Sequence, residues 1–334
     1  MAFRIMLAGG GSGGHAYPLE AIIEEVRRMA PQFHERVEVR CIGSGNIMAR
    51  VAWELGVGYS RVWSPKFRRY KSFRNLLDLF KIPVALAQSC FSVWLFMPDV
   101  MLIKGGYAAF FPALAARMLF IPLIVHESDS IPGKTNLFWG RHARRVFLAF
   151  EHARQYFKPE LSEVVGLPIR SALLVPATQS KPEKPTVFIT GGSQGAQTIN
   201  EVVDLARFEL EKTFTIIHQK DGMWSVQQMR DAYAAADVVV SRAGSAIFEI
   251  AALGKPAILI PLKGSAQEHQ MQNALEFAKH GAIVMDQDNL LPHVLISEIQ
   301  RAYDQRATLS EQIKAFSKPN AATIVAQELL SAAS

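Results

Sequence analysis

The sequence places a histidine, His15, at the end of a loop, Gly9 to Gly14, in which five of the six residues are glycine. Glycines let the backbone pass close to a bulky charged ligand, and a helix that begins after such a loop directs free N–H groups at that ligand. Imidazole titrates near neutral pH and suits a general base. The pattern predicts a phosphate-type loop with a catalytic base, in preference to a histidine that only caps or packs the helix start.

The loop does not fit the two common nucleotide-binding motifs. It matches Gly-x-Gly-x-x-Gly formally, but the next strand ends at Cys41 to Ser44 without the acidic residue that would bind the ribose of NAD. It also lacks the Gly-Lys-Ser/Thr ending of an NTPase P-loop. These departures disfavour nucleotide binding by the first loop.

Strand-like and helix-like runs alternate around this loop and through the rest of the chain. The alternation pauses at a stretch rich in Pro, Ser and Lys, 176–185, and restarts with a second strand and glycine loop at 186–195. Such alternation predicts an α/β fold with two Rossmann-like domains, whose parallel sheets face a central cleft. Ligands are then expected at the carboxyl ends of the strands.

Composition and charge narrow the class of protein. The 334 residues suffice for two domains, and the net charge of +6 is compatible with anionic partners. No nucleic-acid-binding motif accompanies the charge, so nucleic acid is not expected. Cys41 and Cys90 have no metal-ligand spacing, which favours a reducing compartment. The sequence shows no signal peptide, and its longest apolar run, 82–97, is short for a spanning helix, so we expect a cytoplasmic protein with at most peripheral membrane contact.

Seven motifs stand out along the chain: Gly9–His15 with Pro18, Lys104–Tyr107, His126–Asn136, Val165–Arg170, Gly191–Ala196, Arg242–Pro256 and His269–Ala274. Together they resemble the MurG family of glycosyltransferases, which transfer N-acetylglucosamine to undecaprenyl-pyrophosphoryl-MurNAc-pentapeptide. They occur in the family's order and run from about residue 4 to the last helix. The resemblance implies a GT-B architecture.

The resemblance implies a reaction and a binding role for each of the two domains. An inverting transferase would move GlcNAc from UDP-GlcNAc to the MurNAc 4-hydroxyl of lipid I, giving lipid II for peptidoglycan synthesis, and so would serve cell shape and division. Residues 1–163 would bind the acceptor and the membrane, and the helix at about 320–334 would pack back on them. Residues 164–319 would bind UDP-GlcNAc.

The resemblance also implies the site residues. His15 is the expected base and Glu127 the alternative. The acceptor pyrophosphate would lie against Gly13, Gly14, Gly105, Gly106 and Tyr107. The donor would contact Asn136, Arg170, Gly192, Ser193, Val226, Gly244, Ser245, Glu249, His269 and Gln270. Within this donor set, Glu249 would bind the ribose hydroxyls, which suit a carboxylate. Arg170 and Ser193 would bind the phosphates, and Gln270 and His269 the sugar. No metal or cofactor is expected.

A basic stretch, 66–74, carries five cations and no acid, and an apolar run follows it. The stretch suits an anionic membrane surface, and the residues expected there are Arg68, Arg69, Lys71, Leu76 and Phe80. A buried helix with a basic solvent face is the alternative. The resemblance implies the cytoplasmic face of the plasma membrane, with cell-wall synthesis and division proteins as neighbours.

The sequence departs from the family in three places. The segment 218–229 is too short, so one helix–strand unit of the donor domain should be missing near 220–228. Leu167 and Asp129 each stand where the family has asparagine. Two alternatives to a lipid I transferase therefore remain. One is a non-catalytic sugar-nucleotide-binding or scaffold protein, and the other is a transferase with another glycolipid acceptor.

Overall fold

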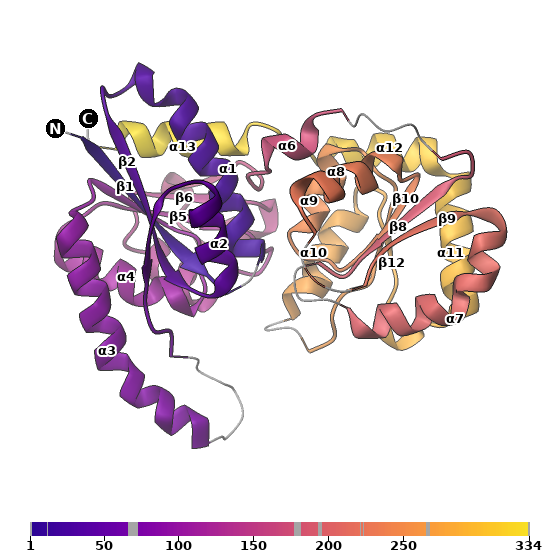
Figure 1. Ribbon diagram of the computed structural model, residues 1–334, viewed down its shortest axis with the longest axis horizontal. Coiled ribbons are helices and arrows are strands. Elements are labelled where there is room, and N and C mark those ends of the chain that lie inside the picture. The colour runs from indigo at the N-terminus through magenta and orange to yellow at the C-terminus, as the bar shows by residue number, and fades with distance from the viewer. Residues whose placement is uncertain are drawn as a thin grey trace. The chain divides into compact units, whose positions relative to one another are not determined.

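The computed structural model describes residues 2–11, 13–65, 73–176, 182–192, 196–220, 222, 224–264 and 268–332, with 73–80 described by backbone alone (Figure 1). The chain forms two compact units. The first comprises Met1–Ser128, Pro132–Pro168 and Asn320–Ser334, and the second comprises Asp129–Ile131 and Ile169–Pro319. The division at Pro168 falls five residues after the boundary expected from the sequence.

The described part of the first unit contains a seven-stranded parallel sheet in the order β3-β2-β1-β4-β5-β6-β7. Its strands are β1 (Phe3–Gly10), β2 (Val37–Ser44), β3 (Gly58–Arg61), β4 (Val100–Ile103), β5 (Leu123–Glu127), β6 (Arg145–Leu148) and β7 (Ser162–Val164). The central strands β1 and β4 consist of buried apolar residues apart from Arg4 in β1, as expected where helices cover both faces of a parallel sheet.

Helices cover both faces of this sheet. They are α1 (Gly13–Met29), α2 (Asn46–Glu54), α3 (Phe73–Phe96), α4 (Tyr107–Met118), α5 (Lys134–Gly140) and α13 (Ala321–Ser331). One apolar core lies between the sheet and α1, α2 and α13, and the other lies between the sheet and α3, α4 and α5. The last helix of the chain thus packs against α1 (Figure 1).

The described part of the second unit contains a five-stranded parallel sheet in the order β12-β11-β10-β8-β9. Its strands are β8 (Thr186–Thr190), β9 (Thr215–Gln219), β10 (Val238–Ser241), β11 (Ala257–Leu259) and β12 (Ile283–Val284). Its helices are α6 (Ser171–Leu174), α7 (Gln197–Thr213), α8 (Val226–Ala235), α9 (Ala246–Ala252), α10 (His269–Ala278), α11 (Pro292–Asp304) and α12 (Arg306–Ala315). Along the described residues, α8 is the element that connects β9 to β10.

The sheets place the predicted site residues at one edge of each unit. Parallel strands share a direction, so the residues after β1 and β4 in the first unit, and after β8 and β10 in the second, lie at the carboxyl ends of their sheets. Both pairs are neighbours in their sheets. None of the described helices is long and apolar enough to span a membrane.

Candidate active site

The predicted base, His15, lies in the first turn of α1 and is oriented by the neighbouring strand. Its Nδ1 is 3.2 Å from the backbone oxygen of Lys104, which follows β4. A carbonyl oxygen can only accept a hydrogen bond, so in the neutral ring the proton is on Nδ1 and the lone pair is on Nε2. A Cβ placed on Gly106 would be 3.8 Å from Nε2, so this nitrogen is directed at the second glycine loop. His15 is therefore held in the tautomer that a base needs.

The second glycine loop requires its glycines. Gly105 has φ +99°, and a Cβ there would be 2.9 Å from the Asn136 amide nitrogen. Gly106 has φ +76° and approaches the backbone oxygen of Gly10, so the two glycine loops touch. Gly13 and Gly14 begin α1, and the half-exposed Tyr107 begins α4. All five predicted acceptor residues thus come together at one edge of the sheet.

Glu127 holds the backbone around it. The side chain is only 3% exposed, and its oxygens accept hydrogen bonds from Ser128 N (2.7 Å), Gly133 N (3.0 Å) and Asn136 Nδ2 (2.9 Å). A carboxylate with three donors around it is poorly placed to take a further proton from a substrate. Asn136, predicted to contact the donor, donates to Glu127 and to the His126 backbone oxygen within the first unit.

A buried polar network beneath the glycine loops was not predicted from the sequence. Lys104 is fully buried, and its Nζ donates to His126 Nδ1 at 3.1 Å and to Ser128 Oγ. His126 Nε2 donates to the Gly166 backbone oxygen at 3.0 Å. Burial, and then the Lys104 charge, hold the pKa of His126 well below its usual value. The sequence feature that could have indicated this network is Lys104 itself, a charged residue directly after four consecutive apolar residues, 100–103.

Two of the donor-binding residues predicted in the second unit, Arg170 and Glu249, contact each other. Arg170 Nη2 lies 3.5 Å from Glu249 Oε1, and both side chains are largely buried. Tyr233, a residue that sequence analysis missed, donates its hydroxyl to Glu249 Oε2 at 3.0 Å. These contacts join the residues predicted for the phosphates and for the ribose.

The remaining predicted donor residues belong to the second unit as well. Gly192 follows β8, Val226 begins α8, and Gly244 and Ser245 precede α9. In α10, His269 Nδ1 lies 2.9 Å from the Ile131 backbone oxygen, and the Gln270 side chain accepts from Leu262 N at 2.9 Å. The structure therefore shows these two side chains in contacts with the protein. Ser193 lies outside the described residues.

Asp129, which stands where the family has asparagine, has a hydrogen-bond partner in the structure. Asn273 Nδ2 donates to Asp129 Oδ1 at 2.9 Å, and Asn273 Oδ1 accepts from both the backbone and the hydroxyl of Ser130 at 2.8 Å. All three residues belong to the second unit. Aspartate can accept the hydrogen bond that this arrangement needs. Leu167 is buried, at 3% exposure.

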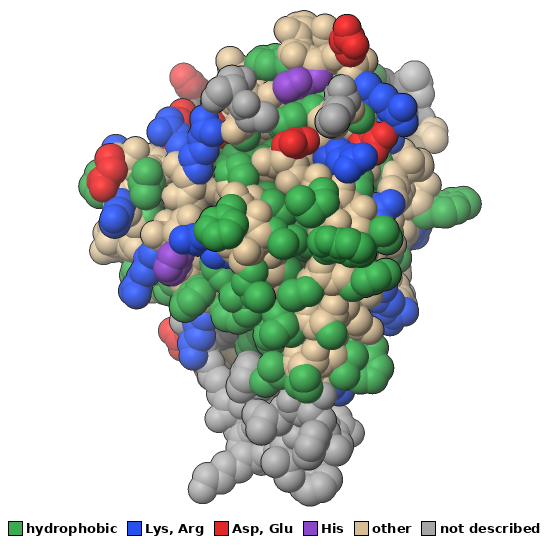
Figure 2. All heavy atoms as spheres, turned by 90° about the vertical axis from the view of Figure 1, so that its left-hand side faces the viewer, with side chains coloured by type: hydrophobic (Ala, Val, Ile, Leu, Met, Phe, Trp, Pro, Cys, Tyr) green, Lys and Arg blue, Asp and Glu red, His purple; other side chains and the backbone are tan. Residues whose placement is uncertain are grey.

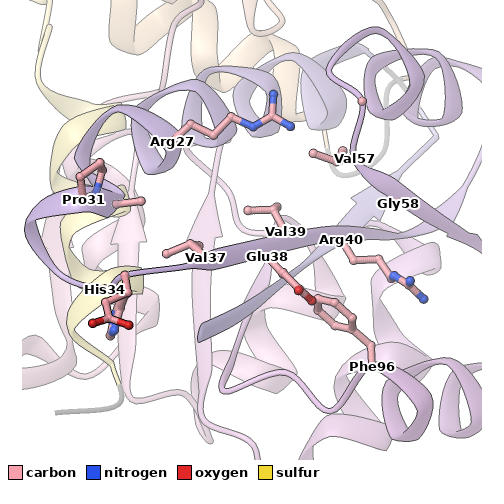
Figure 3. A pocket seen from close by; sticks show the side chains of 13 residues that line it. Arg27, Pro31, His34, Val37, Glu38, Val39, Arg40, Val57, Gly58 and Phe96 are labelled. Atoms are coloured by element: carbon pink, nitrogen blue, oxygen red, sulfur yellow. The ribbon is translucent and has the colours of Figure 1, made fainter. Parts of the chain in front are cut away.

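A cavity of about 580 Å³ lies at the opposite edge of the first sheet. It surrounds the start of β2, where Val37 and Val39 face α1 while Glu38 and Arg40 lie on the other side with Phe96 (Figure 3). It includes none of the predicted site residues. Among the described residues, no three His, Cys, Asp or Glu side chains group as metal ligands. Arg68, Arg69 and Lys71 lie outside the described residues, as do the side chains of Leu76 and Phe80.

Comparison with known proteins identifies the protein family of this chain. Residues 5–148 match the glycosyltransferase family 28 N-terminal domain, and residues 186–225 and 221–327 match its C-terminal domain. The chain is 35% identical, over 94% of its length and 93% of the relative's, to a protein of Legionella pneumophila strain Paris named UDP-N-acetylglucosamine--N-acetylmuramyl-(pentapeptide) pyrophosphoryl-undecaprenol N-acetylglucosamine transferase. A Shouchella clausii protein of the same name is 32% identical over 98% of both chains.

A solved structure shares the fold. The crystal structure of Acinetobacter baumannii MurG aligns with a TM-score of 0.72 and 23% identity, covering 98% of this chain and 99% of that one. The prediction of a two-domain α/β fold of the GT-B type is confirmed by this likeness and by the two parallel sheets. The chain belongs to glycosyltransferase family 28, among the MurG-type N-acetylglucosaminyltransferases.

Proposed function

We propose that this protein transfers N-acetylglucosamine from UDP-GlcNAc to undecaprenyl-pyrophosphoryl-MurNAc-pentapeptide, a step of peptidoglycan synthesis. The observation that carries the proposal is His15, fixed by the Lys104 carbonyl beside two touching glycine loops, in a chain whose relatives carry this activity in their names. Backbone N–H groups of glycine loops and helix starts suit a pyrophosphate. The first unit is therefore the proposed acceptor site.

The reaction assigns a role to each group. The MurNAc 4-hydroxyl oxygen attacks C1 of GlcNAc while His15 Nε2 takes the hydroxyl proton. The bond from C1 to the phosphate oxygen breaks, and UDP leaves with the electron pair, inverting the anomeric centre. Arg170 offsets the charge that develops on the diphosphate, and Glu249 accepts hydrogen bonds from the ribose hydroxyls. The three donors around its carboxylate make Glu127 a positioning residue in this scheme.

We also propose that the first unit contacts the membrane through the outer faces of α3 and α4. These two helices pack on each other, and large apolar side chains are exposed on them and directly after their ends: Phe91, Trp94, Leu95, Met97, Met118 and Phe120. Figure 2 shows hydrophobic side chains gathered on this side of the molecule, with Lys and Arg side chains at the margins. Such a surface fits the interface of an anionic leaflet, where a prenyl-linked acceptor resides. The proposed location is the cytoplasmic face of the plasma membrane.

A transfer assay tests the proposed reaction. The protein is incubated with radiolabelled UDP-GlcNAc and a lipid I analogue, and the disaccharide product is quantified alongside a prenyl-pyrophosphate acceptor that carries a sugar other than MurNAc. We expect labelled disaccharide with the lipid I analogue alone. Transfer only to the other acceptor would contradict the proposed substrate. Binding of UDP-GlcNAc without transfer to either acceptor would indicate a non-catalytic binding protein.

A further inference from the structure

Tyr233 is a buried residue of α8, and its hydroxyl forms a hydrogen bond with Glu249, the predicted ribose ligand. The side chain is 1% exposed, and Phe188 of β8 packs edge-on against its ring with the centroids 5.2 Å apart. Trp224 stacks on the same Phe188 at 5.9 Å. The phenol ring therefore has little freedom to rotate away from its hydrogen-bond partner.

The Tyr233 hydroxyl and Arg170 bind different oxygens of Glu249. Tyr233 donates to Oε2 at 3.0 Å, and Arg170 Nη2 lies 3.5 Å from Oε1. Each carboxylate oxygen offers two lone pairs, so one donor on each oxygen leaves acceptor capacity on both. The Glu249 side chain remains 15% exposed. The carboxylate is thus fixed in direction and is still able to accept hydrogen bonds from two neighbouring hydroxyls.

The protonation of Tyr233 suits a fixed donor. Burial, and then the adjacent Glu249 carboxylate, raise the pKa of the phenol well above its usual value. The hydroxyl keeps its proton over the whole physiological range, so it acts as a donor to Glu249 under all working conditions. Phenylalanine at this position would preserve the ring packing and remove only this hydrogen bond.

We propose that Tyr233 is a positioning residue for the donor nucleotide, because its hydroxyl orients the Glu249 carboxylate toward the vicinal hydroxyls of the ribose. The inference rests on the proposed function, in which Glu249 binds the ribose. It adds a residue from another helix, α8, to the determinants of donor affinity. It also predicts that the contribution of Tyr233 depends on the presence of ribose hydroxyls.

The test compares Tyr233→Phe with the unaltered protein on two donors, UDP-GlcNAc and its 2′,3′-dideoxyuridine analogue. We expect Tyr233→Phe to raise the KM for UDP-GlcNAc roughly tenfold, the lower end of what loss of a hydrogen bond to a charged group costs, with kcat nearly unchanged. The KM for the dideoxy analogue should change less than about twofold, because no ribose hydroxyl remains to be oriented. In a Glu249→Ala background, Tyr233→Phe should have no further effect on either donor.

Two outcomes would overturn the inference. An equal rise in KM for both donors would show that Tyr233→Phe disturbs the site without acting through the ribose hydroxyls. An unchanged KM for both donors would show that the Tyr233 hydroxyl has no role in donor binding. Tyr303→Phe in α11 is the control, since that ring packs on Phe214 away from Glu249. 4-Fluorophenylalanine at position 233 gives the same test if Tyr233→Phe does not fold, and 4-aminophenylalanine, which retains a donor, should restore the KM.

Failure of the inference can be told apart from failure of the proposed function. If the unaltered protein has the same KM for both donors, the ribose contact itself is absent and the proposed role of Glu249 is wrong. If the unaltered protein discriminates between the donors and Tyr233→Phe discriminates equally well, only the role of Tyr233 is wrong.

Discussion

At the scale of single residues, the first glycine loop is explained by what surrounds His15. The carbonyl of Lys104 fixes the imidazole tautomer, and Gly106 leaves room beside Nε2. The carboxylate of Glu127, the alternative base, accepts hydrogen bonds from three neighbouring donors. The two residues are therefore expected to respond differently to substitution.

Glu127→Gln tests the positioning role of this carboxylate. Glutamine replaces one acceptor oxygen by an NH₂ group, which would face Ser128 N or the Gly133 and Asn136 donors. We expect the free energy of unfolding to fall by about 1–3 kcal/mol, the usual cost of an unsatisfied buried group, while turnover of the folded protein falls less than about tenfold. Urea denaturation and the transfer assay measure both quantities.

Glu163→Gln is the matched control for this prediction. Glu163 pairs with Arg145 at a half-exposed position, so its substitution should change stability by less than about 1 kcal/mol. A loss of turnover of several hundredfold in stably folded Glu127→Gln would instead assign the base to Glu127.

Residue types alone could predict part of the site. His15 and the glycines were recognisable because a loop of that composition has few structural uses. Tyr233 and Lys104 were not, because each acts through a partner far away in sequence: Tyr233 through Glu249, and Lys104 through His126. A tyrosine in an amphipathic helix and a lysine after a strand have ordinary interpretations until the fold brings those partners together.

At the scale of elements, β4 and β5 carry the buried network of Lys104 and His126. His126 stays neutral when folded because its pKa is held well below 6.5, whereas the unfolded chain has an ordinary histidine there. The unfolded state therefore binds more protons as the pH falls below about 6.5, and folding stability is lost in that direction. Above about pH 6.5, His126 does not contribute to the pH dependence of folding stability.

His126→Asn should weaken this pH dependence. We expect the unaltered protein to lose up to about 1.4 kcal/mol of unfolding free energy per pH unit from this residue as pH falls from 6.5 toward 5. His126→Asn should be less stable at pH 7.5 but should lose less stability over the same interval. Urea denaturation at several pH values measures the slope, and an unchanged slope would contradict the account. His152→Asn is the control, since His152 lies in the short helix Glu151–Tyr156 and contacts Gln155 outside the network.

The outer faces of α3 and α4 carry the proposed membrane contact. Phe91→Ser combined with Trp94→Ser should reduce sedimentation with phosphatidylglycerol vesicles severalfold, because both side chains are about 60% exposed and would leave the apolar interface. Trp53→Ser is the control, since Trp53 is 82% exposed on α2, which covers the opposite face of the sheet. If the unaltered protein, the double variant and Trp53→Ser bound the vesicles equally, this face would not be part of the membrane contact.

At the scale of the whole molecule, the alternation of strands and helices predicted two parallel sheets, and both are present in the described residues. Periodicity suffices here because buried parallel strands such as β4 and β10 are continuous apolar runs. It could not show that Asp129–Ile131 belongs with the second unit, because that assignment depends on Asn273, more than a hundred residues later. Contacts of this range are set by the fold and leave no local pattern.

We propose that His15 is the base of a glycosyl transfer by this chain. The most direct test measures transfer from UDP-GlcNAc to a lipid I analogue, and the affinity for UDP, in the unaltered protein and in His15→Asn. The account predicts UDP affinity within about twofold of the unaltered protein and transfer slowed by about a hundredfold or more, the usual contribution of a general base. Transfer at an unchanged rate in His15→Asn would contradict it.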